Sequence, residues 1–484
     1  MKKKVSMFLT SCIIAFGLVG VHTSAEASTS QIQTLDQSVQ KIVSEKMAGA
    51  DVSIAIRDEK GNVIYDLNGN QKQKPASNMK LLTSAAALEI LGENYRFKTN
   101  AFYTGKIKNG VLKGDIYLQG TGDPTLNKED LEQFVGSVSA LGIKQIDGRI
   151  VADDFWFDQD LLTPGIDEDD ESYYYAAPIT ALTTSPNSDY DSGTIIVEAK
   201  GEKLGDKPTL TITPELGDLV IENNAKTVES NQPNTITIER QFRTNKIVVN
   251  GNVPINKSLK EWVTVQNPTT HTLTMFKHLL EQKNIQISKD KLYRAKTPNN
   301  AKLIAQKQSM PLSQLMIPYM KLSNNGIADI LVKTMGKVKM HKGSTEAGLK
   351  ILRKYAKSRH LNIEEWTFED GSGMSHSNRV SSINLTHLLF TVQKEKWFNT
   401  YFNSLPVAAN SERMVGGTLR NRLKSPLTAG KVIAKTGSLS GVNTLSGYLI
   451  GSSGKPYTFS ILVQNKSGTI PAIDEIVEVM AKQL

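Results

Sequence analysis

The pattern of apolar and polar residues near the N-terminus predicts a helix, a hairpin and a second helix. Apolar residues recur at helical spacing within residues 28–50. Two β-rich runs at 52–57 and 63–66 flank a turn-rich link and predict a hairpin. A second helix is expected to begin at Pro75 and to stop at Gly92, because proline suits a first turn and glycine a helix end.

The middle of the chain has a different texture. From about residue 97 to 262, short β-rich runs alternate with Gly, Asn, Asp and Pro turns, and few helices are apparent between 185 and 262. We therefore expect one or two inserted β-rich domains in this region.

The C-terminal part returns to helices and then to strands. Helical periodicity recurs in five segments, at 272–283, 311–320, 327–337, 345–359 and 383–393. Three strands and a final helix follow, at 431–436, 444–450, 457–463 and 470–482. Since strands lie near both ends of the chain, we predict a single sheet built from both ends, with the middle hanging off it as an insertion.

Composition narrows the class of protein. Of the 484 residues, 39% are hydrophobic and 22% charged, which excludes a disordered, collagen-like or polytopic membrane protein and indicates two or more globular domains. The single cysteine, Cys12, lies in the N-terminal leader. A processed chain would hold none, which excludes disulfides, thiolate metal sites and cysteine nucleophiles.

The leader has the features of an export signal. Lysines at positions 2–4 precede a mostly apolar run, and Ala25-Glu26-Ala27 is a small-x-small cleavage site. We predict a signal peptide over residues 1–27 and secretion into the cell wall space, the alternative being an uncleaved anchor. Its removal would change the formal net charge from +9 to +7. This balance favours anionic wall polymers or a membrane surface over nucleic acid as partners, or else it only keeps the protein soluble.

Three short motifs carry candidate chemistry. They are Ser77-x-x-Lys80, Ser323-Asn324-Asn325 and Lys435-Thr436-Gly437. Each pattern alone is weak, but Ser77 and Lys80 open an apolar helix, and the Lys-Thr-Gly triplet ends a strand that leads into a tight hairpin.

These residue types suit acyl transfer by a serine nucleophile. Residues three apart share a helix face, so the Lys80 amine can reach the Ser77 hydroxyl. Burial and the nearby cation Lys435 would lower the pKa of Lys80 and let it act as a base. Ser323 can relay a proton to the leaving amine, and Asn325 can bind both the substrate backbone and Lys80.

The third motif suits recognition of a peptide terminus. Lys435 can pair with a terminal carboxylate, and Thr436 can donate a hydrogen bond to it. Gly437 would let the substrate backbone lie along the strand edge. The backbone N–H groups of Ser77 and Ser438 are candidates for an oxyanion hole.

This trio, in this order, is the signature of penicillin-binding proteins and serine β-lactamases. Four further segments, at 121–126, 151–154, 369–375 and 416–423, make the chain similar to the low-molecular-mass class C penicillin-binding proteins, the D-alanyl-D-alanine carboxypeptidase/endopeptidases. The resemblance covers nearly the whole mature chain. A compact β-lactamase would have no room for the insertion between the first two motifs.

The resemblance implies an α/β (α+β) fold, a transpeptidase-like domain whose antiparallel sheet is flanked by helices. It also implies two nested β-rich inserted domains. We expect the catalytic domain at 28–96 and 263–484, the first insertion at 97–185 and 251–262, and the second at 186–250.

The same resemblance implies the activity. A peptidoglycan stem peptide ending in D-Ala-D-Ala would acylate Ser77, D-alanine would leave, and water would release the product, with no metal or cofactor. Crosslinks would be cut by the same chemistry, and β-lactams would acylate Ser77. In relatives, an acidic residue and a tyrosine hold the amino end of a diaminopimelyl side chain. Asp170 and Tyr175 fit that spacing, although the acidic run around Asp170 also suits a solvated surface. His376 stands where some relatives carry arginine.

Two other functions are weighed against this one. A β-lactamase or esterase could use the same nucleophile, and a non-catalytic wall-binding or penicillin-sensing module could keep the fold without the chemistry. The long insertion and the intact Lys-Thr-Gly argue against the first alternative, and the complete set of motifs argues against the second. The sequence leaves open the oligomeric state and the preference for peptides or crosslinks.

Overall fold

Strands from both ends of the chain form one antiparallel sheet, as the sequence predicts. The computed structural model describes residues 29–166, 168–289, 291–364 and 366–484, so the predicted signal peptide lies outside the described residues. The sheet has the order β2-β1-β22-β21-β20. Its strands are β1 (Asp51–Arg57), β2 (Val63–Leu67), β20 (Val432–Leu439), β21 (Val442–Ile450) and β22 (Pro456–Gln464).

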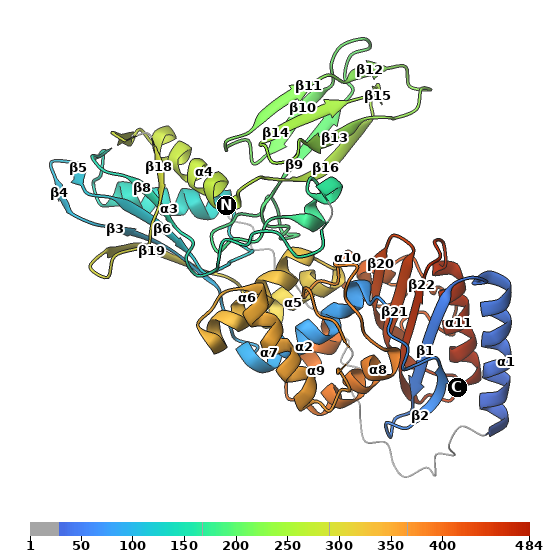
Figure 1. The fold of residues 1–484 in the computed structure, drawn as a ribbon. Coiled ribbons are helices and arrows are strands. Elements are labelled where there is room, and N and C mark those ends of the chain that lie inside the picture. The colour runs from blue at the N-terminus through green and yellow to red at the C-terminus, as the bar shows by residue number, and fades with distance from the viewer. Residues whose placement is uncertain (1–28, 167, 290, 365) are drawn as a thin grey trace, which may run out of the picture.

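Helices cover both faces of this sheet. The two terminal helices, α1 (Thr29–Lys46) and α11 (Ile470–Gln483), pack together on one side (Figure 1). On the other side α8 (Ser382–Thr391) contacts β1, β21 and β22. The remaining helices of this part are α2 (Met79–Leu91), α5 (Leu312–Lys321), α6 (Asn325–Met340), α7 (Thr345–Ser358), α9 (Phe398–Ser404) and α10 (Arg413–Gly416).

Helix α2 is central to this arrangement. Every residue from Met79 to Leu88 is buried, so the helix has no solvent-facing stripe. It follows the one-turn 3₁₀ helix η1 (Ala76–Asn78) and ends before Gly92, at a φ of 82°. A helix buried all round is a rigid base for residues at its N-terminus.

A first lobe is inserted after β2 and α2, on the left of Figure 1. Its two sheets have the orders β18-β8-β6-β3-β19 and β17-β7-β5-β4. The strands are β3 (Lys98–Tyr103), β4 (Lys106–Lys108), β5 (Val111–Lys113), β6 (Ile116–Gly120), β7 (Gln145–Ile146), β8 (Ile150–Asp153), β17 (Gln286–Ile287), β18 (Leu292–Arg294) and β19 (Lys302–Gln308). Helices α3 (Lys128–Ala140) and α4 (Pro268–Gln282) share their core.

The return from this lobe differs from the expected boundary at residue 263. Helix α4 and strands β17 to β19 pack in the first lobe, because Phe276 and Leu279 bury their side chains in the same core as Leu118 of β6. Helix α3 also interrupts a region expected to be β-rich; its stripe of Leu131, Phe134, Val135 and Val138 faces that core.

A second, all-β lobe projects at the top of Figure 1. It comprises β9 (Thr194–Lys200), β10 (Thr209–Thr213), β11 (Val220–Asn223), β12 (Lys226–Val228), β13 (Thr237–Arg240), β14 (Lys246–Asn250), β15 (Asn252–Pro254) and β16 (Ser258–Thr264). Strand β16 pairs with β9 and β15 with β12, so 251–262 packs with this lobe and not with the first insertion as expected. The division into a catalytic part and two insertions stays a prediction, with its boundaries moved by this packing.

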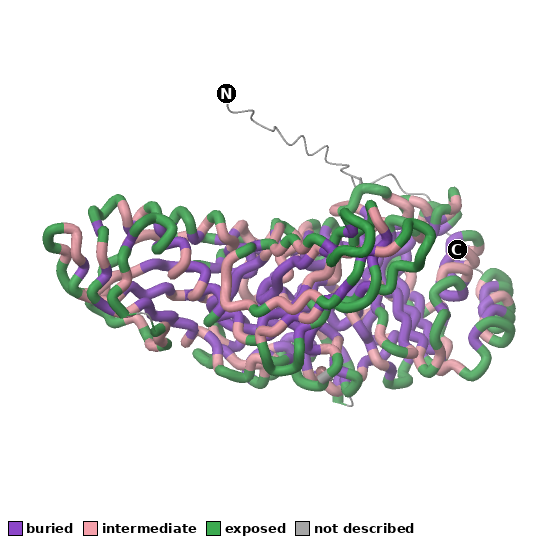
Figure 2. Tube along the Cα trace, turned by 90° about the horizontal axis from the view of Figure 1, so that it is seen from above, coloured by how far each residue is buried: buried purple, intermediate pink, exposed green. Residues whose placement is uncertain are grey.

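Burial runs through the whole length of the molecule. In Figure 2 the buried segments follow the interior from the first lobe to the sheet formed by the chain ends. Within the described residues, no helix combines the length and the apolar character that crossing a bilayer requires.

Candidate active site

The three motifs singled out in the sequence meet in one place. Turn η1, which holds Ser77, contacts β20 and β21. Lys80 Nζ lies 2.9 Å from Ser77 Oγ, and Lys435 Nζ on β20 lies 2.7 Å from Ser323 Oγ just before α6. Lys80 Nζ also donates to Asn325 Oδ1 at 2.6 Å, which joins all three motifs.

Strained backbone positions shape the turn around the serines. Ala76 has a φ of 45° and Ser323 a φ of 61°, in the left-handed region that side chains other than glycine rarely adopt. A Cβ on Gly437 would come within 2.9 Å of Ser77 N, and one on Gly373 within 1.8 Å of Ala76 O. Glycine at these two positions therefore lets β20 and the loop at residues 369–375 approach the Ser77 turn.

Lys80 is fully buried, with its amine held by three acceptors. These are Ser77 Oγ, Asn325 Oδ1 and, at 2.6 Å, the Ser372 carbonyl. Burial lowers the pKa of Lys80 to about 7, although nearby Asp329 and Asp370 favour its charged form. A substantial neutral fraction is therefore present near neutral pH, as a base requires.

Two buried carboxylates behind Lys80 were missed by the sequence reasoning. Burial raises the pKa of Asp329 to about 7 and also raises the pKa of Asp370. Asp370 accepts the backbone N–H groups of Gly373 and Ser375, which shapes the loop that presents the Ser372 carbonyl. Asp370 belongs to the 369–375 segment quoted above, but the position of Asp329 on the buried face of α6 carried no sequence signal.

Lys435 is the second fully buried amine of the site. Its Nζ donates to Ser323 Oγ and, at 2.8 Å, to the Thr436 carbonyl. Burial lowers the pKa of Lys435, and the charge of Lys80 lowers it further. Thr436 Oγ1 donates to Thr418 Oγ1 at 2.7 Å, which connects the motif to the 416–423 segment.

The candidate recognition residues fall into two groups. The Tyr175 carbonyl accepts a 3.0 Å hydrogen bond from Asn325 Nδ2, and the Tyr175 hydroxyl donates to Asp170 Oδ1 at 2.8 Å, so these two residues adjoin the site. Ser438 is exposed on β20, with its Oγ bonded to Asn443. His376 is also exposed, and among the described residues its ring forms no hydrogen bond with the other site residues.

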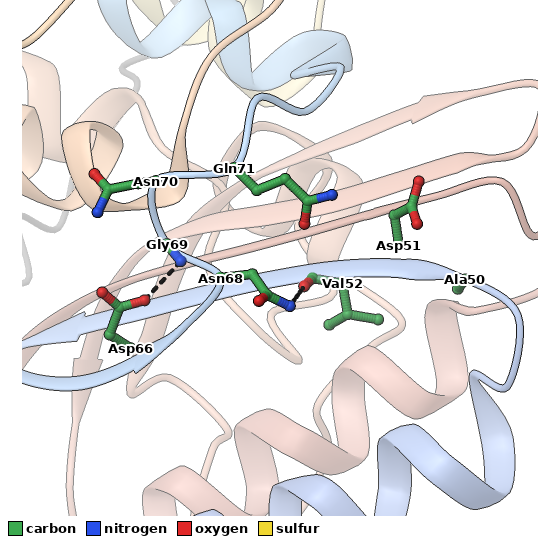
Figure 3. A pocket seen from close by; sticks show the side chains of 8 residues that line it. All are labelled: Ala50, Asp51, Val52, Asp66, Asn68, Gly69, Asn70 and Gln71. Atoms are coloured by element: carbon green, nitrogen blue, oxygen red, sulfur yellow. Dashed lines mark hydrogen bonds between the residues drawn. The ribbon is translucent and has the colours of Figure 1, made fainter.

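A separate pocket of about 570 Å³ lies beside β1 and β2 (Figure 3). Its lining includes Asp66, which accepts from the Gly69 N–H, and Asn68, which donates to the Val52 carbonyl. These groups stabilise the local turn, and the lining contains none of the three motifs. The Ser77 cluster is therefore the better candidate for chemistry.

Known proteins resemble this chain over almost its full length. A D-alanyl-D-alanine carboxypeptidase from Actinomadura sp. (strain R39) is 33% identical over 477 residues, which cover 97% of this chain and 88% of that protein. The crystal structure of penicillin binding protein 4 from Haemophilus influenzae has a TM-score of 0.78 at 23% identity, covering 91% of this chain and 98% of that one. A structure of the same protein with a β-lactam has a TM-score of 0.73 at 23% identity, with the same coverage. The model of the D-Ala-D-Ala carboxypeptidase 3 (S13) family matches residues 33–483, and the chain belongs to this family.

Proposed function

We propose that the protein is an exported serine-type D-alanyl-D-alanine carboxypeptidase, with endopeptidase activity, that acts through an acyl-enzyme on Ser77. The observation that carries the proposal is the 2.9 Å contact between Lys80 Nζ and Ser77 Oγ in a buried site where the pKa of Lys80 is about 7. A neutral amine at hydrogen-bond distance is what activation of a serine hydroxyl needs.

Acylation follows from this geometry. Neutral Lys80 takes the Ser77 proton as Oγ attacks the carbonyl of the penultimate D-alanine. The backbone N–H groups of Ser77 and Ser438 stabilise the oxyanion. Ser323, bonded to Lys435 Nζ, passes its hydroxyl proton to the amine of the departing D-alanine and is reprotonated from the Lys80 ammonium. Water then attacks the acyl-enzyme carbonyl and loses a proton to Lys80, and Ser77 Oγ regains a proton as the product acid leaves.

Substrate binding uses the strand edge beside this nucleophile. β20 is the last strand in the order of its sheet, so a peptide can extend along it at Gly437. Lys435 and Thr436 bind the terminal carboxylate, and Asn325 the peptide backbone. Asp170 and Tyr175 take the amino end of a diaminopimelyl side chain, and His376 contributes at the rim.

β-Lactams are the second class of ligand that we propose. The strained ring amide would acylate Ser77 in place of the peptide, with its carboxylate on Lys435 and Thr436. The fold similarity to a penicillin-binding protein solved with a β-lactam supports this proposal. We further propose secretion across the cytoplasmic membrane, and anionic wall polymers or a membrane surface as peripheral partners.

Release of D-alanine tests the carboxypeptidase. The purified protein should release it from a diaminopimelyl peptide ending in D-Ala-D-Ala, and the Ser77→Ala variant should not. Equal release by the variant would remove Ser77 as nucleophile. Lack of release by the unmodified protein would favour a non-catalytic module.

Two further measurements separate the remaining alternatives. Fluorescent penicillin should stay bound to Ser77 for minutes or longer, whereas rapid turnover would indicate a β-lactamase. Mass spectrometry of peptidoglycan digests before and after treatment should show both trimmed stems and cleaved crosslinks. Trimming alone would contradict the endopeptidase part of the proposal.

A further inference from the structure

A buried arginine in the all-β lobe is bonded to the segment that borders the active site. Arg240, the last residue of β13, has a fully buried side chain. Its Nη2 donates to Glu171 Oε1 at 3.0 Å and to the Glu171 carbonyl at 3.1 Å. The Glu171 side chain is itself 8% exposed, so this is an ion pair removed from water.

Further hydrogen bonds fix the same stretch of chain. The backbone N–H of Arg240 donates to Ser172 Oγ at 2.7 Å. Thr264 of β16 donates its hydroxyl to the Glu171 carbonyl at 2.5 Å and its N–H to the Ser172 carbonyl at 3.0 Å. The hydroxyl of Thr264 also accepts from Arg240 Nε at 3.2 Å. Residues 171 and 172 are therefore held by two strands of the all-β lobe.

The candidate recognition residues lie immediately on either side of this attachment. Asp170 directly precedes Glu171, and Tyr175 lies three residues after Ser172. The ring of Tyr173 stacks on that of Tyr175, at 5.5 Å between centroids and 13° between planes. The Tyr173 hydroxyl donates to Glu239 Oε1 at 3.2 Å, again on β13.

The segment has little regular secondary structure. Its described residues form two one-turn 3₁₀ helices, η2 (Glu168–Asp170) and η3 (Tyr174–Ala176), and Tyr173 forms an isolated β-bridge with Val263 of β16. From the segment, the Tyr175 carbonyl reaches Asn325, and Asn325 reaches Lys80. A continuous set of bonds thus runs from the all-β lobe to one wall of the site.

We propose that Arg240 is a positioning residue for selection of the acyl donor: it holds Asp170 and Tyr175 where they bind an amino-bearing side chain of the peptide. This inference rests on the proposed function of the site. It gives the all-β lobe a defined role, since that lobe supplies the support for the recognition wall. Acylation by a small ligand without such a side chain needs only the three motifs and should not depend on Arg240.

The test compares a peptide with a small acylating agent. Arg240→Met keeps the aliphatic stem and removes the guanidinium. For the diaminopimelyl peptide we expect kcat/KM to fall about tenfold or more, mainly through KM. The acylation rate with benzylpenicillin should change less than about threefold. Arg243→Met, at an exposed arginine three residues away whose guanidinium stacks on Phe242, is the matched control and should leave both rates unchanged.

A second variant covers the case in which Arg240→Met does not fold, because a lone buried Glu171 carboxylate is strongly destabilising. Thr264→Val removes one hydroxyl from the same attachment while keeping the side-chain shape. It should also lower kcat/KM for the peptide without slowing acylation by benzylpenicillin, but by a smaller factor than Arg240→Met. Equal losses for peptide and benzylpenicillin, or no loss for either, would overturn the proposal.

Hydrogen exchange supplies a readout that does not depend on activity. Amides of residues 168–176 should exchange faster in the variants, while those of α2 stay protected. If the unmodified protein acylates with benzylpenicillin but never turns over the peptide, the proposed function fails. In that case hydrogen exchange at residues 168–176 becomes the only test of the role of Arg240. Unchanged protection of these amides in the variants would overturn the inference.

Discussion

Lys435 Nζ donates a 2.7 Å hydrogen bond to Ser323 Oγ, although 112 residues separate them in the chain. Lys435 comes from a central part of β20, and Ser323 from the turn just before α6. The contact unites the residue proposed to bind the substrate carboxylate with the residue proposed to protonate the leaving group. Under the proposed function, binding of the substrate carboxylate and departure of D-alanine would be coupled through the Lys435 amine.

Replacing Lys435 should weaken transition-state binding. We expect Lys435→Ala to lower kcat/KM for the D-Ala-D-Ala peptide by about 30- to 1,000-fold, which corresponds to about 2–4 kcal/mol, because the carboxylate loses its ion pair. Steady-state D-alanine release measures the effect. Lys431→Ala, at an exposed lysine just before β20, is the control. A loss in kcat/KM below threefold would contradict the role of Lys435 in binding the substrate carboxylate.

The rate of acylation should depend on the protonation of Lys80. Only the neutral amine can take the Ser77 proton, and burial lowers the pKa of Lys80 to about 7. The acylation rate with benzylpenicillin should therefore rise with pH through about 7. Stopped-flow measurements between pH 5.5 and 8.5 provide the profile. A flat or falling profile would be inconsistent with Lys80 as the base.

Asp329 should shift that profile. Burial raises the pKa of Asp329 to about 7, and the ionised carboxylate favours the protonated form of Lys80, so the neutral Asp329→Asn variant should have a lower Lys80 pKa. The rising limb of the acylation profile should then move to lower pH. Asp147→Asn, at an exposed position in the first lobe, should leave it in place. A shift of the rising limb to higher pH would contradict the stabilisation of protonated Lys80 by the Asp329 carboxylate.

A side chain at Gly437 should disturb the nucleophile. The added Cβ of Gly437→Ala would lie 2.2 Å from Thr444 Oγ1 and 2.9 Å from Ser77 N, so β20 or the Ser77 turn must move. We expect about a tenfold or greater loss in acylation rate, with about 1–3 kcal/mol of destabilisation. Gly136→Ala, in α3 with nothing within 4 Å of the new Cβ, is the control for both measurements.

Lys321 should make stability depend on pH. It is buried with its Nζ on the Leu405 carbonyl, and burial lowers its pKa to about 7. Between this value and the ordinary lysine pKa of about 10.5, the unfolded chain binds more protons, so stability rises with pH. This group contributes up to about 1.4 kcal/mol per pH unit in that window.

Urea unfolding at pH 7.5 and 9.5 measures this dependence. Lys321→Met should show a smaller gain in unfolding free energy between the two pH values than the unmodified protein. Lys424→Met, at an exposed lysine, should keep the full gain. An identical gain in Lys321→Met would show that this amine keeps its proton over the window.

Local periodicity accounts for most of what the sequence predicted about the fold. The predicted single sheet from both chain ends was confirmed. The β-rich runs at 52–57 and 444–450 are bounded by turn residues, which makes them recognisable as strands. The lobe boundaries were less accessible. Helix α4 has an ordinary amphipathic pattern. Such a pattern predicts that one face is buried, but it does not show against which of two neighbouring cores that face packs.

The family and the proximity of the three motifs were also predictable from the sequence, because each motif is a short run of residues with a recognisable place at a helix start or on a strand. Asp329 and Arg240 were not. Each occupies an inward position on a regular element, where a charged residue gives no periodic signal, and its partner lies far away in the chain. Their importance appears only once the tertiary contacts are known.

The pairing of β1 with β22 has a consequence for how the protein matures. Ser77, the proposed nucleophile, comes before both lobes in the sequence, whereas β20, which contacts the Ser77 turn, comes after them. Both projecting lobes can complete their own cores while the growing polypeptide still lacks β20. The three motifs can therefore meet only after β20 has been made and paired, so a chain that stops before Val432 would lack the contact between Lys435 and Ser323.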